Sequence, residues 1–161
     1  MDKTLQLVIP ALMGVESTVA YELKKLGLSE VKAENGRVLC QGSPADIPRA
    51  NINLRTGARV LLCLGTFEAR SFEELFQGCA ALPWEDYIPR EGRFPVKGYA
   101  ISSQLHSVPA CQSILKKALC KRLGSVYGLE DLPETGALYQ VQFSILKDTV
   151  TLMLDTSGDS L

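Results

Sequence analysis

The stretch that decides the fold is residues 96–123, VKGYAISSQLHSVPACQSILKKALCKRL. Its start completes a strand predicted over residues 94–101, and the polar run SSQLHS separates this strand from a helix predicted over residues 108–124. The helix would bury one arc and expose the opposite one, with Cys111, Ile114, Leu115, Ala118 and Leu119 on the first and Ser113, Lys116, Lys117 and Lys121 on the second. Arg122 falls on the apolar arc, so it either lies past the last full turn or extends its charged end to solvent.

The same stretch is the centre of a basic segment that the formal net charge of −1 conceals. Residues 92–129 carry six basic and no acidic side chains, whereas residues 1–91 carry ten basic and twelve acidic, and residues 130–161 one basic and six acidic. Exposed helix faces usually mix signs, because oppositely charged side chains one turn apart stabilise each other. The missing carboxylates therefore favour a surface for a polyanion, and a lysine-rich solvated face is the alternative.

Toward the N-terminus, residues 1–67 predict the order strand, helix, strand, strand, helix, strand of a ferredoxin-like unit. Strands are predicted over residues 4–10 and 58–67, and Asn35-Gly36 supplies the tight turn of a hairpin over residues 31–41. One helix ends at Gly27, and the other runs from Ser43-Pro44 to about Thr56, with its first turns delayed by Pro48.

A second unit is predicted over residues 68–155. Ser71, with Glu74 three residues later, predicts the start of a helix, and residues 82–95 form a connection interrupted by Pro and Gly. Residues 138–157 predict a long hairpin whose first strand has one covered face and one polar face, the covered face carrying Tyr139, Val141, Phe143 and Ile145 and the polar face Gln140, Gln142 and Ser144. The fold class is therefore α+β in two small domains, with residues 156–161 beginning a linker.

The start of the predicted helix adds phosphate-binding groups to the basic segment. Ser102, Ser103, Gln104 and Ser107 precede the helix and follow the strand that carries Lys97. Free N–H groups at a helix start attract phosphate, and lysines contact a nucleic-acid backbone independently of its sequence.

These segments resemble a known family. Residues 96–123 resemble the strand, Ser-rich loop and helix of a THUMP domain, and ANINLRTGARVLLCLGTFEA (residues 50–69) is similar to part of the ferredoxin-like domain that precedes THUMP in bacterial ribosomal RNA guanine-N2 methyltransferases. TLMLDTSGDSL (residues 151–161) is similar to the last THUMP strand and to the linker that leads, in those enzymes, to an HxRGYR sequence and a methyltransferase domain. The resemblance covers essentially the whole chain.

The resemblance implies an RNA-capture module that grips structured RNA, expected to be ribosomal, and presents a nucleotide to a separate catalytic domain. Matched position by position, it implies RNA contacts at Lys97, Ser102, Ser103, Ser107, Gln112, Lys116 and Lys117. The exposed arc of the helix adds Lys121, and the pattern of the first domain adds Arg55 and Arg59, either of which could equally be structural.

The sequence departs from these enzymes because it ends where their catalytic domain begins. It has no Gly-rich cofactor loop after a strand and no Pro-Pro pair. We therefore expect no catalysis and no cofactor in this chain, with S-adenosylmethionine bound by a domain of a longer parent protein, unless the chain is a stand-alone binding module. With no apolar run of about 20 residues and no signal-peptide pattern, the expected location is the cytoplasm, with neither a membrane nor DNA as a partner.

A module of another class stays open, namely a ferredoxin-like regulatory or assembly domain that binds a small anion or a protein and no RNA. The motifs that other kinds of chemistry need are missing from the sequence. His106 lies near two serines without a nucleophile-elbow motif, and no carboxylate pair has His or Cys at ligand spacing. The five cysteines include no CxxC and are expected to be reduced. Trp84, Tyr87 and Phe94 could stack on bases, although packing between subdomains is the preferred interpretation.

Overall fold

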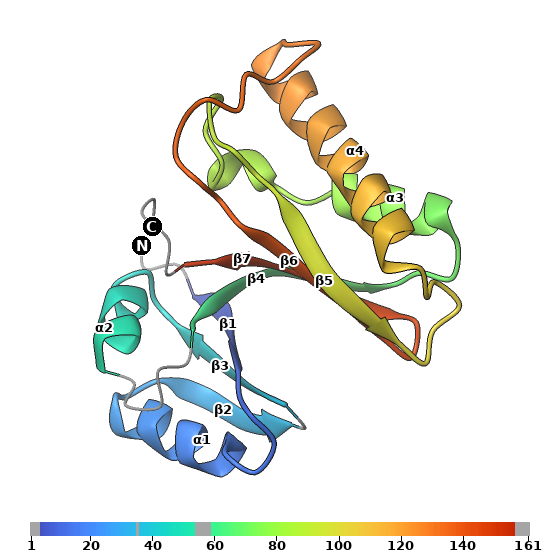
Figure 1. Ribbon diagram of the computed structural model, residues 1–161. Coiled ribbons are helices and arrows are strands. Elements are labelled where there is room, and N and C mark those ends of the chain that lie inside the picture. Colours follow the sequence, from blue (N-terminus) through green and yellow to red (C-terminus); the bar gives the residue numbers. More distant parts are fainter. Residues whose placement is uncertain (1–3, 35, 54–58, 157–161) are drawn as a thin grey trace. The chain divides into compact units, whose positions relative to one another are not determined.

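The computed structural model describes residues 4–34, 36–53 and 59–156, apart from the side chains of residues 52 and 53 (Figure 1). These residues form two compact units. The first unit contains the chain up to Cys63 together with Asp155 and Thr156, and the second contains Leu64–Leu154. The chain passes from the first unit to the second within strand β4 (Leu61–Glu68).

The first unit has the element order that the sequence predicts: β1 (Leu5–Pro10), α1 (Glu16–Lys25), β2 (Ser29–Glu34), β3 (Arg37–Gly42), α2 (Asp46–Asn53) and β4. Its strands lie in the order β2-β3-β1-β4, and every pair is antiparallel. Helix α1 buries Val19 and Leu23. Pro48 lies in the first turn of α2, where its missing N–H breaks no helical hydrogen bond. The predicted end of this helix near Thr56 lies outside the described residues.

The second unit continues with α3 (Phe72–Ala80), the 3-10 turn η1 (Trp84–Asp86), β5 (Val96–Ile101), α4 (Val108–Tyr127), β6 (Val141–Leu146) and β7 (Thr149–Asp155). Strand β5 pairs in parallel with β6, β6 pairs antiparallel with β7, and β5 is the edge strand in the order β4-β7-β6-β5. The predicted cap of α3 is confirmed, because the Ser71 hydroxyl accepts the Glu74 N–H at 3.2 Å.

Helices α3 and α4 cover one face of this sheet (Figure 1). The register pairs Gly98 with Phe143, and a Cβ on Gly98 would lie 2.6 Å from the Phe143 ring, so Gly98 faces the buried layer. Residues alternate between the two faces of a strand. The other face of β5 therefore carries Lys97, Tyr99 and Ile101, all of them exposed.

The aromatic residues of the connection belong to the core. Trp84 and Phe94 are buried, and the Trp84 ring N–H donates to the Cys79 carbonyl at 2.8 Å. Tyr87 is half-buried. Because Trp84 and Phe94 are buried, neither ring has a free face on which an RNA base could stack. This agrees with the interpretation that these aromatic residues pack inside the protein. Ser144 is buried, whereas the alternation along the strand predicts that it lies on the polar face.

Candidate nucleic-acid interface

Helix α4 presents two lysines to solvent. Most of the predicted arcs are confirmed, with Cys111, Leu115, Ala118 and Leu119 buried and Ser113, Lys117 and Lys121 exposed. Ile114 and Lys116 are half-buried instead. The helix is longer than the sequence predicts and ends at Tyr127. Gly128 follows it with a φ of 69°, the left-handed conformation that favours glycine just past a helix end. At the other end, Ser107 caps the helix by accepting the Ala110 N–H at 3.4 Å.

Lys117 and Lys121, four residues apart, lie on the same face of α4, and we call them the α4 lysine pair. The Lys121 ammonium lies 5.4 Å from the centre of the Phe76 ring. Within the described part of the chain, neither ammonium has a carboxylate within 4.0 Å. The pair is therefore a source of uncompensated positive charge on an exposed helix face.

Lys116, the neighbouring residue, is instead held within the protein. Its ammonium donates to a Glu134 carboxylate oxygen at 2.6 Å and to the Phe94 carbonyl at 3.1 Å, and it lies 3.7 Å from the centre of the Phe94 ring. The same Glu134 oxygen accepts the Phe94 N–H at 3.2 Å. Burial raises the pKa of Glu134, but the hydrogen bonds from Lys116 and Phe94 outweigh it and leave the pKa lowered. The RNA contact predicted for Lys116 stays a prediction, and these bonds indicate a structural role.

An ion pair accounts for the position of Arg122 on the apolar arc of α4. Helix α4 continues beyond it, so the residue does not lie past the last turn. Its guanidinium makes two hydrogen bonds to the Glu85 carboxylate, at 2.9 and 2.6 Å. The charged end is thus turned out of the core toward a carboxylate from the connection, and half of the basic side chains in residues 103–122 are neutralised by acids from outside that stretch.

We expect Arg122→Met to lower the melting temperature in a pH-dependent way. The hydrogen bonds from Arg122 hold the pKa of Glu85 below its ordinary value of 4.5. A carboxylate with a depressed pKa stabilises the folded state above its unfolded pKa, and this contribution disappears as the pH falls through the lower folded value. The difference between wild type and variant should therefore be largest near neutral pH and shrink below pH 4.5.

Thermal melts at several pH values test this prediction. Lys121→Met, the adjacent and exposed lysine, is the matched control and should show no such pH dependence. The melting temperatures of wild type and Arg122→Met could instead differ by the same amount at neutral and at acidic pH. That result would show that packing of the arginine stem, rather than the ion pair, stabilises the fold.

The Ser-rich loop before α4 is fixed by Asp148. Its carboxylate accepts the Gln104 N–H at 2.8 Å and the Arg70 Nε–H at 3.2 Å, and its own N–H donates to the Ser103 hydroxyl at 3.0 Å. The backbone bond to Gln104 is the main reason that the pKa of Asp148 is lowered. Ser102, with a φ of 50°, is held exposed in this loop. The loop conformation therefore depends on the turn between β6 and β7.

Within the second unit, the predicted site residues do not form one patch. Gln112 donates to the Val96 carbonyl at 3.1 Å and ties α4 to β5. Lys97 is exposed on the sheet face opposite to the one that the helices cover. Arg59 belongs to the first unit, where it pairs with Asp155 at 2.7 Å. Arg55 lies outside the described residues.

Sequence reasoning assigned no role to Asp148, to Tyr99 or to Lys147. The signal for Asp148 was the Lys147-Asp148 pair at the centre of the hairpin, where both residues have positive φ, of 48° and 65°. Asp tolerates that conformation better than most residues, and it hydrogen-bonds to neighbouring N–H groups. Tyr99 was detectable from the alternation of small or apolar with larger residues in VKGYAI.

Two family models together match most of the chain. The model described as the RlmL ferredoxin-like domain matches residues 6–61, and the model described as the THUMP domain matches residues 69–155. The chain belongs to the THUMP family. The predicted α+β fold, a ferredoxin-like domain followed by a THUMP domain, is thereby confirmed.

The curated relatives of this chain are longer than the chain itself. YpsC of Bacillus subtilis, named provisionally as an RNA methyltransferase, is 42% identical over 161 residues, which are 99% of this chain and 42% of the relative. The ribosomal RNA large subunit methyltransferase K/L of Syntrophotalea carbinolica is 29% identical over 164 residues, covering 100% of this chain and 23% of the relative. The chain thus spans less than half the length of these relatives.

Two solved structures share the fold of this chain. A Listeria monocytogenes protein, titled a predicted N6-adenine-specific DNA methylase, superposes with a TM-score of 0.92 at 47% identity, over 97% of this chain and 41% of that one. A protein titled provisionally as a methyltransferase and solved in complex with SAH gives a TM-score of 0.91 at 43% identity, over 98% of this chain and 43% of that one.

Proposed function

We propose that this chain is the RNA-binding portion of an S-adenosylmethionine-dependent ribosomal RNA methyltransferase. The observation that carries the proposal is the succession of the RlmL ferredoxin-like and THUMP models along one chain. Both named curated relatives are RNA methyltransferases by name, and one of the names specifies large-subunit ribosomal RNA. In this proposal residues 1–67 and 68–155 are the two binding domains, and the chain acts in the cytoplasm, where ribosomal RNA is found.

Methyl transfer would take place in a part of the parent protein outside this chain. The SAH complex of a structural relative supports S-adenosylmethionine as the methyl donor of such a parent. Guanine N2 is the acceptor that the family resemblance implies. The role of the present chain would be to hold the RNA while one of its nucleotides enters the methyl-transfer site of the parent protein.

The α4 lysine pair is the proposed centre of phosphate recognition. Its ammonium groups are exposed, whereas the ammonium of Lys116 is held by Glu134. Lysines contact phosphates rather than bases. The major groove of A-form RNA is deep and narrow, so side chains cannot reach the base edges in it. Binding would therefore depend on the shape of a folded RNA. Ser102, Ser103 and Ser107 remain proposed contacts at the start of the helix.

The test of this function is the salt dependence of RNA binding by the full chain. Fluorescence anisotropy with a labelled ribosomal RNA hairpin should give a slope of log affinity against log salt of about −2 or steeper, because each neutralised phosphate contributes roughly −0.7 to −0.9. Affinity should then fall about tenfold or more between 50 and 200 mM salt. A DNA hairpin of the same sequence is the control and should bind more weakly.

Absence of RNA binding at low salt would overturn the proposal. It would favour the assembly module that binds a protein or a small anion. Equal affinity for RNA and DNA hairpins would contradict recognition of A-form shape and leave only a general attraction to polyanions.

A further inference from the structure

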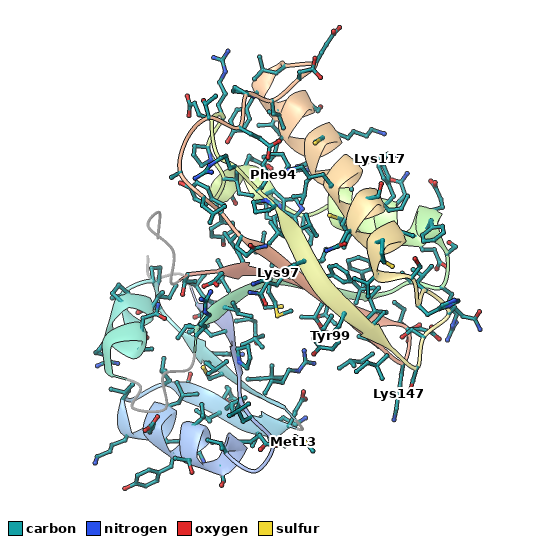
Figure 2. All side chains as sticks on the ribbon, in the orientation of Figure 1. Met13, Phe94, Lys97, Tyr99, Lys117 and Lys147 are labelled. Carbon is teal, nitrogen blue, oxygen red and sulfur yellow. The ribbon has the colours of Figure 1, made fainter. Side chains whose placement is uncertain are left out.

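The exposed face of β5 carries an aromatic ring between two cations. Lys97, Tyr99 and Ile101 lie on this face, and the Lys147 N–H donates to the Ile101 carbonyl at 3.2 Å, which places Lys147 beside the end of the strand. Figure 2 shows Lys97, Tyr99 and Lys147 following one another along β5 toward the turn between β6 and β7. We call these three residues the β5 row.

Each member of the β5 row is available to a ligand. Tyr99 is 45% exposed although its side chain is large and aromatic, and Ile101, two residues along the strand, is 55% exposed. Among the described residues, no carboxylate lies within ion-pair distance of Lys97 or Lys147, and the Tyr99 hydroxyl has no hydrogen-bond partner. The Asp148 carboxylate next to Lys147 is already used by Gln104 and Arg70. The β5 row therefore combines an exposed aromatic ring with two ammonium groups that no carboxylate of the described residues neutralises.

We propose that the β5 row binds an unpaired RNA nucleotide, with its base stacked on Tyr99 and the flanking phosphates next to Lys97 and Lys147. This inference rests on the proposed function and adds a second contact region, on the sheet face away from α4. Residues two apart on a strand lie roughly 6.6 Å from each other, so the row suits an extended single strand better than a duplex, whose bases are stacked inside. Stacking on an exposed aromatic ring flanked by cations is a general way of holding single-stranded nucleic acid.

The experiment compares two RNAs, a blunt hairpin and the same hairpin with a four-nucleotide single-stranded extension that contains 2-aminopurine. Wild-type chain should bind the extended hairpin more tightly, and 2-aminopurine fluorescence should fall on binding as the base stacks. In Tyr99→Ala the affinity for the extended hairpin should fall roughly tenfold, while binding of the blunt hairpin is unchanged. Tyr99→Phe should restore both the preference and the quenching because it restores the ring face.

Tyr21→Ala is the matched control, since Tyr21 is an exposed tyrosine on α1. It should leave the preference for the extended hairpin intact. If the wild-type chain binds the blunt hairpin but gains nothing from the extension, the inference on the β5 row is overturned while the proposed function stands. Binding of neither RNA overturns both. A dimer in sedimentation that Tyr99→Ala dissociates would also overturn the inference, by showing that the row pairs with a second copy.

Discussion

Replacing both Lys117 and Lys121 by glutamate is expected to weaken RNA binding about 100-fold at moderate salt. The two exposed ammonium groups lie on one face of α4, and no carboxylate of the described residues compensates them. Reversing both charges removes two favourable phosphate contacts and creates two repulsive ones. The magnitude of the salt slope should fall by roughly 1.4 to 1.8, because each lost phosphate contact lowers it by roughly 0.7 to 0.9.

The measurement is the same anisotropy titration, carried out over a range of salt concentrations. Lys24→Glu with Lys25→Glu is the matched control, because both lysines are exposed on α1 and the change in net charge is identical. An equal loss of affinity in the two double variants would mean that only net charge matters, and the α4 lysine pair would no longer be the proposed centre of the interface. Circular dichroism of each variant checks that the loss is not caused by unfolding.

Lys116→Met is expected to lower the free energy of unfolding by about 2 kcal/mol, through loss of charge-assisted hydrogen bonds. The variant keeps the bulk of the side chain but removes the ammonium that binds Glu134 and the Phe94 carbonyl. Both partners of the ion pair have side chains that are 33% exposed, so the effect should exceed that of a surface pair and stay below that of a fully buried one. Urea denaturation at neutral pH measures it.

Lys117→Met is the matched control for this experiment, since it makes the same substitution one residue along the helix at an exposed position. It should leave the free energy of unfolding unchanged and weaken RNA binding. Lys116→Met should do the opposite. If instead Lys116→Met keeps its stability and loses RNA affinity, the ammonium must leave Glu134 to contact RNA, as the family resemblance implied.

Local patterns were sufficient to predict most of the fold. The periodicity of residues 108–124 identified the buried arc of α4, and the Ser71–Glu74 spacing identified the cap of α3, because hydrogen bonds and side-chain directions within one helix depend on near neighbours in the chain. Local hydrophobic patterns and turn residues likewise predict the order of strands and helices in the first unit. Boundaries were less accurate, as the end of α4 at Tyr127 shows.

The distribution of charge was decided by the tertiary structure. By itself the sequence determined that residues 92–129 are basic and that Lys116, Lys117 and Lys121 share one arc of a helix. Only the fold decided that Glu134 neutralises Lys116, that Glu85 neutralises Arg122, and that Lys97 lies on the other sheet face. The reason is that an ion pair depends on distance in space, and these carboxylates lie 18 and 37 residues from their partners in the chain.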